Sequence, residues 1–104
     1  MRVQVLRDAC CAQDDQLGPL EANFEVPQGA TIGDLVSIIV ESRFLQYSSS
    51  HTSMVGFVGE KPFVRVFSSY YAPNRGPEFV SPSTELVTTV LGNQAIEFRF
   101  VSGV

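Results

Sequence analysis

Residues 31–44 read Thr-Ile-Gly-Asp-Leu-Val-Ser-Ile-Ile-Val-Glu-Ser-Arg-Phe, and this stretch decides the fold. Its apolar residues recur at intervals of three and four, which places them in one stripe along a helix. The stripe consists of Ile32, Leu35, Val36, Ile39 and Val40. Thr31 is a suitable N-cap, and Asp34 stands where a capping-box carboxylate reaches back to the cap. The pattern predicts one long amphipathic helix over residues 31–44.

The same stretch is rich in β-branched residues, and these are also typical of a buried strand. The residues that fit that alternative are Val36, Ile38, Ile39 and Val40. A polar face opposite the stripe is supplied by Ser37, Glu41 and Ser42, and the stretch is 14 residues long. Both features favour the helix, since buried strands are shorter and have no polar stripe at helical spacing.

The segments on either side of this helix have the patterns of strands. Before it, residues 1–6 and 20–26 alternate between apolar and polar side chains. The loop between these two segments is too short for a parallel crossover, so we expect them to pair antiparallel. After the helix, residues 54–58 and 63–67 flank a turn that contains glycine, which predicts a hairpin.

The end of the chain predicts a short helix or helical turn followed by a final strand. Residues 83–91 have Ser83 as a candidate cap and Gly92 as a stop signal. Residues 95–101 are expected to form the strand, with Ile96, Phe98 and Phe100 facing the core. One long helix plus a short helical turn can cover one face of a mixed four- or five-stranded sheet. The prediction is therefore a single α+β domain over residues 1–104.

Composition and charge narrow the class of protein. Hydrophobic residues make up 44% of the chain and charged residues 17%, which excludes a disordered chain. The net charge of −4 disfavours binding to nucleic acid, because phosphate backbones are repelled. No apolar run reaches the length of about 18 residues that a membrane helix needs. The opening residues do not resemble a signal peptide. Cys10 and Cys11 are adjacent, and a disulfide between neighbours is strained and restrains little, so we expect a reduced cytoplasmic protein. We expect it to be a monomer or weak dimer.

The order of strand, strand, helix, two strands, short helix and strand resembles the ubiquitin-like β-grasp. The resemblance rests on the opening hairpin, on residues 26–35 (Val-Pro-Gln-Gly-Ala-Thr-Ile-Gly-Asp-Leu) leading into the helix, and on the helical turn before the last strand. It implies a mixed sheet packed on one long helix. Ubiquitin-like modifiers and sulfur carriers end in Gly-Gly, whereas this chain ends Val101-Ser102-Gly103-Val104. Neither conjugation nor sulfur transfer is therefore implied.

Residues 7–15 carry a second resemblance. They read Arg-Asp-Ala-Cys-Cys-Ala-Gln-Asp-Asp, which is similar to an Arg-Asp-x-x-Cys-x-x-Asp-Asp segment in a family of small bacterial proteins of unassigned role. This resemblance implies a bacterial origin and names no activity.

The same segment holds the densest group of reactive side chains, namely Asp8, Cys10, Cys11, Asp14 and Asp15. A structural zinc site needs about four Cys or His ligands, and His51 is the only histidine. The aspartates lack the spacing and turn glycine of a calcium loop. They would also raise the pKa of a nearby thiol, which lowers its reactivity. We therefore expect no metal, no cofactor and no enzymatic activity; the alternative is a small cysteine-dependent enzyme or redox protein that uses Cys10 or Cys11.

Residues 70–79 read Tyr-Tyr-Ala-Pro-Asn-Arg-Gly-Pro-Glu-Phe, a composition favoured at protein interfaces. The candidate partner-binding residues are Tyr70, Tyr71, Arg75 and Phe79. In the alternative interpretation, Tyr71 and Phe79 only pin the loop to the domain. A free sheet edge is a further candidate surface. The sequence thus predicts a non-enzymatic protein-interaction or adaptor domain, and its negative charge favours a basic partner protein.

Overall fold

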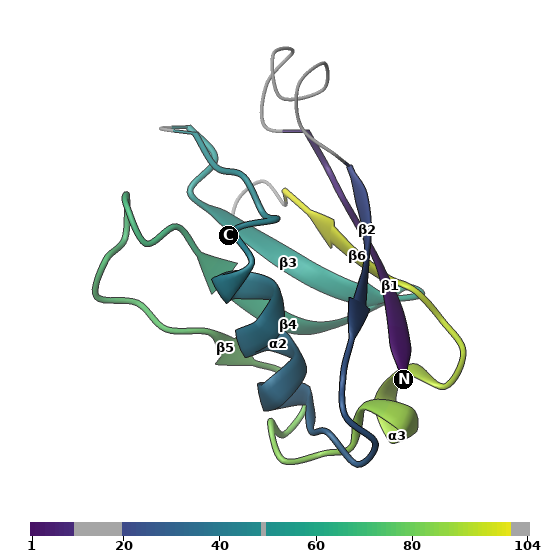
Figure 1. Ribbon diagram of the computed structural model, residues 1–104. Coiled ribbons are helices and arrows are strands. Elements are labelled where there is room, and N and C mark those ends of the chain that lie inside the picture. The colour runs from purple at the N-terminus through teal and green to yellow at the C-terminus, as the bar shows by residue number, and fades with distance from the viewer. Residues whose placement is uncertain (10–19, 49, 101–104) are drawn as a thin grey trace.

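The computed structural model describes residues 1–9, 20–48 and 50–100, which form a mixed six-stranded sheet and two helices (Figure 1). The strands are β1 (Arg2–Arg7), β2 (Glu21–Glu25), β3 (Ser53–Val58), β4 (Lys61–Phe67), β5 (Glu78–Phe79) and β6 (Ile96–Arg99). The helices are α2 (Ile32–Glu41) and α3 (Val87–Leu91). The α+β class is confirmed. The expected four or five strands are too few, because the end of the predicted loop pairs with β4 as a short edge strand, β5.

The strand order across the sheet is β2-β1-β6-β3-β4-β5. The two predicted hairpins are confirmed, because β1 pairs antiparallel with β2 and β3 pairs antiparallel with β4. The last strand, β6, lies between the hairpins, parallel to β1 and antiparallel to β3. Helix α2 lies across one face of this sheet (Figure 1). The first and last strands are therefore neighbours at the centre of the molecule.

The predicted capping box at the start of α2 is confirmed. The hydroxyl of Thr31 accepts a hydrogen bond from the backbone N–H of Asp34 at 3.2 Å. The carboxylate of Asp34 accepts one from the N–H of Thr31 at 3.0 Å. The carboxylate also lies at the positive end of the helix dipole, which favours its charge.

The segment before α3 supplies the remaining caps of α2. The N–H of Ile32 donates to the carbonyl of Glu85 at 2.8 Å, and the N–H of Gly33 donates to the carbonyl of Ser83 at 2.9 Å. The prediction that Ser83 caps the last helix is therefore wrong: α3 follows Leu86, which makes no side-chain cap. Ser83 acts through its backbone on a helix fifty residues earlier, which a local pattern does not reveal.

Helix α2 ends at Glu41, so the predicted helix over residues 31–44 is too long. The hydroxyl of Ser42 donates to the carbonyl of Ile39 at 2.6 Å and accepts from the N–H of Phe44 at 3.2 Å. These bonds replace the next helical bonds. Arg43 then takes a left-handed backbone conformation, with φ +61°, and the chain turns away from the helix axis.

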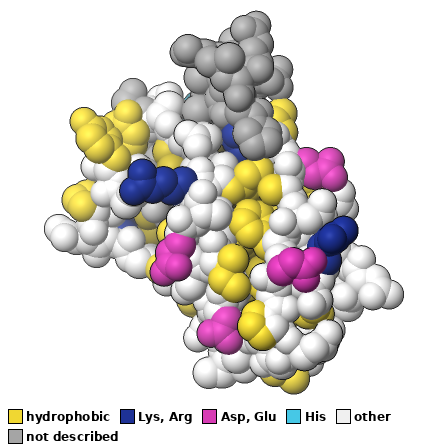
Figure 2. Space-filling view, viewed as in Figure 1, with side chains coloured by type: hydrophobic (Ala, Val, Ile, Leu, Met, Phe, Trp, Pro, Cys, Tyr) yellow, Lys and Arg dark blue, Asp and Glu magenta, His cyan; other side chains and the backbone are white. Residues whose placement is uncertain are grey.

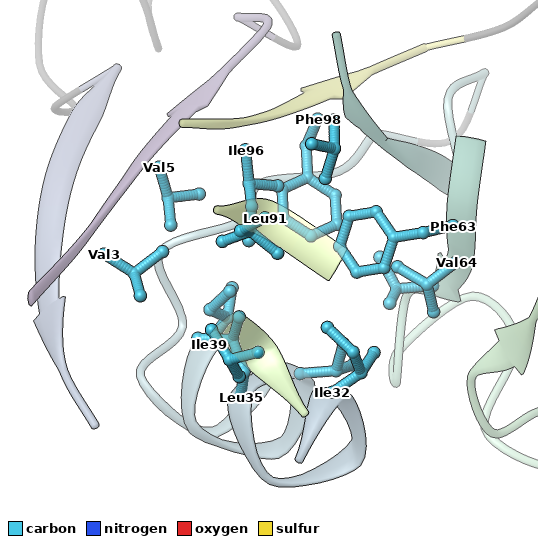
Figure 3. Close-up of a cluster of buried hydrophobic side chains, with 14 of the residues drawn as sticks. Val3, Val5, Ile32, Leu35, Ile39, Phe63, Val64, Leu91, Ile96 and Phe98 are labelled. Atoms are coloured by element: carbon cyan, nitrogen blue, oxygen red, sulfur yellow. The ribbon is translucent and has the colours of Figure 1, made fainter. Parts of the chain in front are cut away.

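The hydrophobic core lies between the sheet and the two helices. Figure 3 shows side chains from α2, α3, β1, β4 and β6 pointing toward one another. The alternation of the strands and the helix stripe predict eight core residues: Val3, Val5, Phe24, Leu35, Ile39, Val66, Ile96 and Phe98. All of them except Phe24 are buried. The eighth, Phe24, is only partly buried on the edge strand β2, with its ring edge-on to that of Phe44 at 5.8 Å.

At Gly56 in β3, two aromatic rings of the core lie close to the backbone. A Cβ atom there would lie 2.9 Å from the ring of Phe98 and 3.0 Å from the ring of Phe63. Both distances are shorter than a carbon contact allows, so two phenyl rings pack over a backbone that has no side chain. The strand register also shifts between Gly56 and Phe57.

Candidate functional site

A sharp backbone turn follows β4 and positions the first two candidate residues. Ser68 is buried, and its hydroxyl accepts hydrogen bonds from the N–H groups of Tyr70 and Tyr71, both at 3.1 Å. The N–H of Ala72 donates to the Ser68 carbonyl at 2.9 Å. These three bonds fix the backbone below two consecutive tyrosines.

The two tyrosine side chains project from this turn into solvent. Tyr70 is 82% exposed and Tyr71 is 45% exposed. Their rings pack edge to face on each other, with centroids 4.8 Å apart. Within the described residues, neither ring belongs to the side chains packed against the hydrophobic core. The turn therefore presents aromatic surface instead of burying it.

The other two candidate residues, Arg75 and Phe79, are held by contacts within the domain. The guanidinium of Arg75 pairs with the carboxylate of Glu78 at 2.8 Å and lies 4.0 Å from the ring centroid of Phe67. Phe79 lies in β5, pairs with Val64 and packs against the core. These two side chains hold the C-terminal part of the loop against the domain, whereas the side chains of Tyr70 and Tyr71 are exposed to solvent.

Tyr70 and Tyr71 line an open groove of about 440 Å³, which we call the tyrosine groove. The end of α2 and the segment after it also line the groove, with Val40, Arg43 and Tyr47. Figure 2 shows hydrophobic side chains close to a basic one on this side of the molecule, at the upper left of the view. The groove therefore joins two segments that lie far apart in the sequence.

Exposed apolar surface concentrates at this groove. In the described ranges, five large hydrophobic side chains are exposed: Val40, Tyr70, Tyr71, Val80 and Leu86. The first three line the tyrosine groove. Val40 is 40% exposed, so its expected place in the buried helix stripe is wrong. Clustering of this kind is more informative than single exposed residues, which are common on any surface.

Arg43 gives the tyrosine groove its charge. Among the described residues that line the groove, it is the one that carries a charge. Within the described part of the chain, its guanidinium has no hydrogen-bond or ionic partner, although its backbone carbonyl accepts a bond from Gln46 at 3.0 Å. The sequence pattern placed Arg43 inside the helix. Arg43 stands in the left-handed position after the C-cap Ser42, where glycine is usual, so its residue type does not mark the end of the helix.

Tyr47, which packs against the core, also lines the tyrosine groove. Burial raises the pKa of Tyr47 to about 12, because the phenolate would lose its hydration there. The phenol is therefore neutral at physiological pH and is able to donate a hydrogen bond.

The other residues singled out in the sequence give no site in the described ranges. Cys10, Cys11, Asp14 and Asp15 lie outside them, so the metal and thiol hypotheses stay predictions. Asp8 is described, and its carboxylate accepts a hydrogen bond from the N–H of Phe100 at 3.1 Å. The exposed ring of His51 packs on Phe100, with centroids 4.7 Å apart. Neither helix is long and apolar enough to cross a membrane, in the part of the chain that is described.

Comparisons of the chain with protein-family models, with curated proteins and with solved structures find no match. The inference of a function therefore rests on the chain's own fold and surface.

Proposed function

We propose that this chain is a non-enzymatic protein-interaction domain of the ubiquitin-like β-grasp type, and that it binds its partner at the tyrosine groove. Two features support the β-grasp assignment: the opening β1–β2 hairpin and the parallel pairing of β1 with β6, beneath a crossing helix. The proposal covers binding alone. It assigns the chain no role as a conjugated modifier.

The observation that carries the proposal is the exposure of Val40, Tyr70 and Tyr71 around one groove. Tyrosine buries a large area at a small cost in side-chain entropy, which is why it is favoured in binding surfaces. The hydrogen bonds to Ser68 already fix the turn before a partner arrives. Such preorganisation lowers the cost of ordering the loop on binding.

The chemistry of the tyrosine groove supports binding over catalysis. General acid–base catalysis needs a side chain that changes protonation near neutral pH. Neither a carboxylate nor an imidazole is among the described residues that line the groove. The phenol of Tyr47 has its pKa moved further from neutrality, to about 12.

The proposed partner is another protein that is basic overall. The net charge of −4 attracts such a protein over long range and speeds its approach, and this attraction weakens as salt rises. The proposal includes a cytoplasmic, bacterial setting in which Cys10 and Cys11 stay reduced.

A photo-crosslinking amino acid at position 70 tests the proposal, with the same group at position 80 as the control. We expect a specific protein to be crosslinked from position 70 and not from position 80. Both positions are exposed, but only Tyr70 lines the tyrosine groove.

The purified partner then allows a quantitative test. Tyr70→Ser combined with Tyr71→Ser should raise Kd at least about tenfold, the size of a hot-spot loss. The Tm should stay within about two degrees, while Val80→Ser should change neither quantity. Full affinity in the double variant would place the interface elsewhere, for example at the outer edge of β2. Early unfolding would show that the tyrosines serve the fold.

A further inference from the structure

Three features of the tyrosine groove indicate the chemistry of its ligand, and the first is the backbone conformation of Arg43. Its φ of +61° lies in the left-handed region, which disfavours any residue with a Cβ atom and suits glycine. Nothing in the described contacts of the side chain compensates for this conformation. A strained backbone at an exposed arginine that lines a groove suggests that this residue is kept for binding and not for stability.

The second observation is the local sign of charge. The whole chain carries −4, yet Arg43 is the charged side chain among the described residues that line the groove. The guanidinium of Arg75, on the loop after β4, stacks on Phe67, which also lines the groove. Arg75 already pairs with Glu78, so Arg43 is the guanidinium available to a ligand. A planar guanidinium matches a carboxylate through two parallel hydrogen bonds.

The third observation is the composition of the walls beside Arg43. Val40, Tyr70 and Tyr71 line the groove with exposed apolar surface, and Tyr47, which also lines it, is a neutral phenol. A volume of about 440 Å³ lies in the range of ligand pockets, and it suits a few side chains but no folded element. The groove therefore offers an anion site beside an apolar one.

We propose that the tyrosine groove takes a short peptide segment of the partner in which a carboxylate neighbours a large apolar side chain. Arg43 holds the carboxylate, and Val40, Tyr70 and Tyr71 cover the apolar side chain. This inference rests on the proposed function and adds the chemistry of the ligand. A partner that is basic overall is compatible with it, because net charge governs approach while Arg43 governs the docked contact.

Selection from random heptapeptide display libraries tests this inference without knowledge of the partner. One library presents the peptides with a free C-terminus, and the other presents them inside a carrier loop. Against the wild-type domain we expect enrichment of Asp or Glu next to Leu, Phe, Tyr or Trp. Enrichment in both libraries assigns the carboxylate to a side chain, and enrichment only at free ends assigns it to the peptide terminus. Neutral or basic winners, or no enrichment, would overturn the inference.

Arg43→Gly separates the anion site from the fold. We expect this variant to lose at least about fivefold in affinity for the selected peptide, as for a charge-assisted hydrogen bond. It should also lose the preference for that peptide over its Asn or Gln counterpart. Its Tm should stay equal or rise by a few degrees, because glycine relieves the left-handed strain. A lower Tm, or a retained preference for the acidic peptide, would refute the role of Arg43.

The two proposals fail in different ways. If Arg43→Gly binds the crosslinked partner normally while Tyr70→Ser with Tyr71→Ser does not, the carboxylate inference fails and the interaction surface stands. If the tyrosine double variant binds the partner normally, the proposed function fails at this surface, whatever the selected peptides look like. Val80→Ser is the control in each measurement, because Val80 is exposed and lies outside the groove.

Discussion

At the level of single residues, one buried hydroxyl fixes the backbone turn that carries the two exposed tyrosines. Ser68 is 3% exposed and accepts from two consecutive backbone N–H groups, those of Tyr70 and Tyr71. Its own N–H donates to the carbonyl of Thr52 at 2.9 Å, which ties the turn to the segment before β3. The backbone below both tyrosines therefore depends on a side chain that is almost completely buried.

Ser68→Ala should lower the free energy of unfolding by about 1–2 kcal/mol, the usual cost of removing such a cap. Two N–H groups would lose their acceptor, and no other partner for them is present in the described structure. Ser69→Ala is the matched control, because Ser69 is an exposed neighbour in the same turn. Urea unfolding measures both variants. Equal stability of the two would mean that water replaces the hydroxyl without loss.

At the scale of elements, helix α2 shows what its local sequence determines. The capping box needs only residues three apart in the chain, and Thr31 and Asp34 predict it correctly. The end of the helix depends on Ser42, whose hydroxyl competes for backbone groups, and the apolar pattern continues past it to Phe44. The strand β5 has no alternating pattern of its own and forms because β4 offers it an edge.

Thr31→Ala tests the cap of this helix. It should cost about 1 kcal/mol of stability, because the N–H of Asp34 loses its acceptor. Ser37→Ala, in the exposed middle of α2, should be neutral or slightly stabilising, since alanine is the better helix former. Chemical denaturation of both variants gives the comparison. A loss of the same size in both would assign the effect to the helix surface.

The candidate site was predictable only in part, because some of its residues come together through contacts between segments that are distant in the sequence. An irregular run of aromatic, proline and charged residues marks residues 70–79 in the sequence, and two of its tyrosines are exposed. Val40, Arg43 and Tyr47 carry no comparable signal. They join the groove because the end of α2 lies beside the turn after β4, a contact between segments more than twenty residues apart.

At the scale of the whole molecule, the sheet holds together because α2 covers its apolar face. Ile39→Ala should cost on the order of 2–5 kcal/mol, since Ile39 is fully buried among the core side chains. Its neighbour Val40 is 40% exposed, so Val40→Ala should cost far less. Thermal unfolding separates the two variants by several degrees in Tm. Similar melting of both would mean that α2 is rotated relative to the sheet.

The central position of β6 has a consequence for how the chain is made. The hairpins β1–β2 and β3–β4 each form from neighbouring residues, but the sheet is continuous only through β6, which is synthesised last. Until residues 96–99 exist, β1 and β3 each keep one unpaired edge of backbone N–H and C=O groups. Such edges pair readily with other chains. A product of interrupted translation that lacks β6 would therefore consist of two hairpins with unpaired strand edges. We expect such a product to aggregate or to be bound by chaperones and proteases, and not to fold as a destabilised form of the domain.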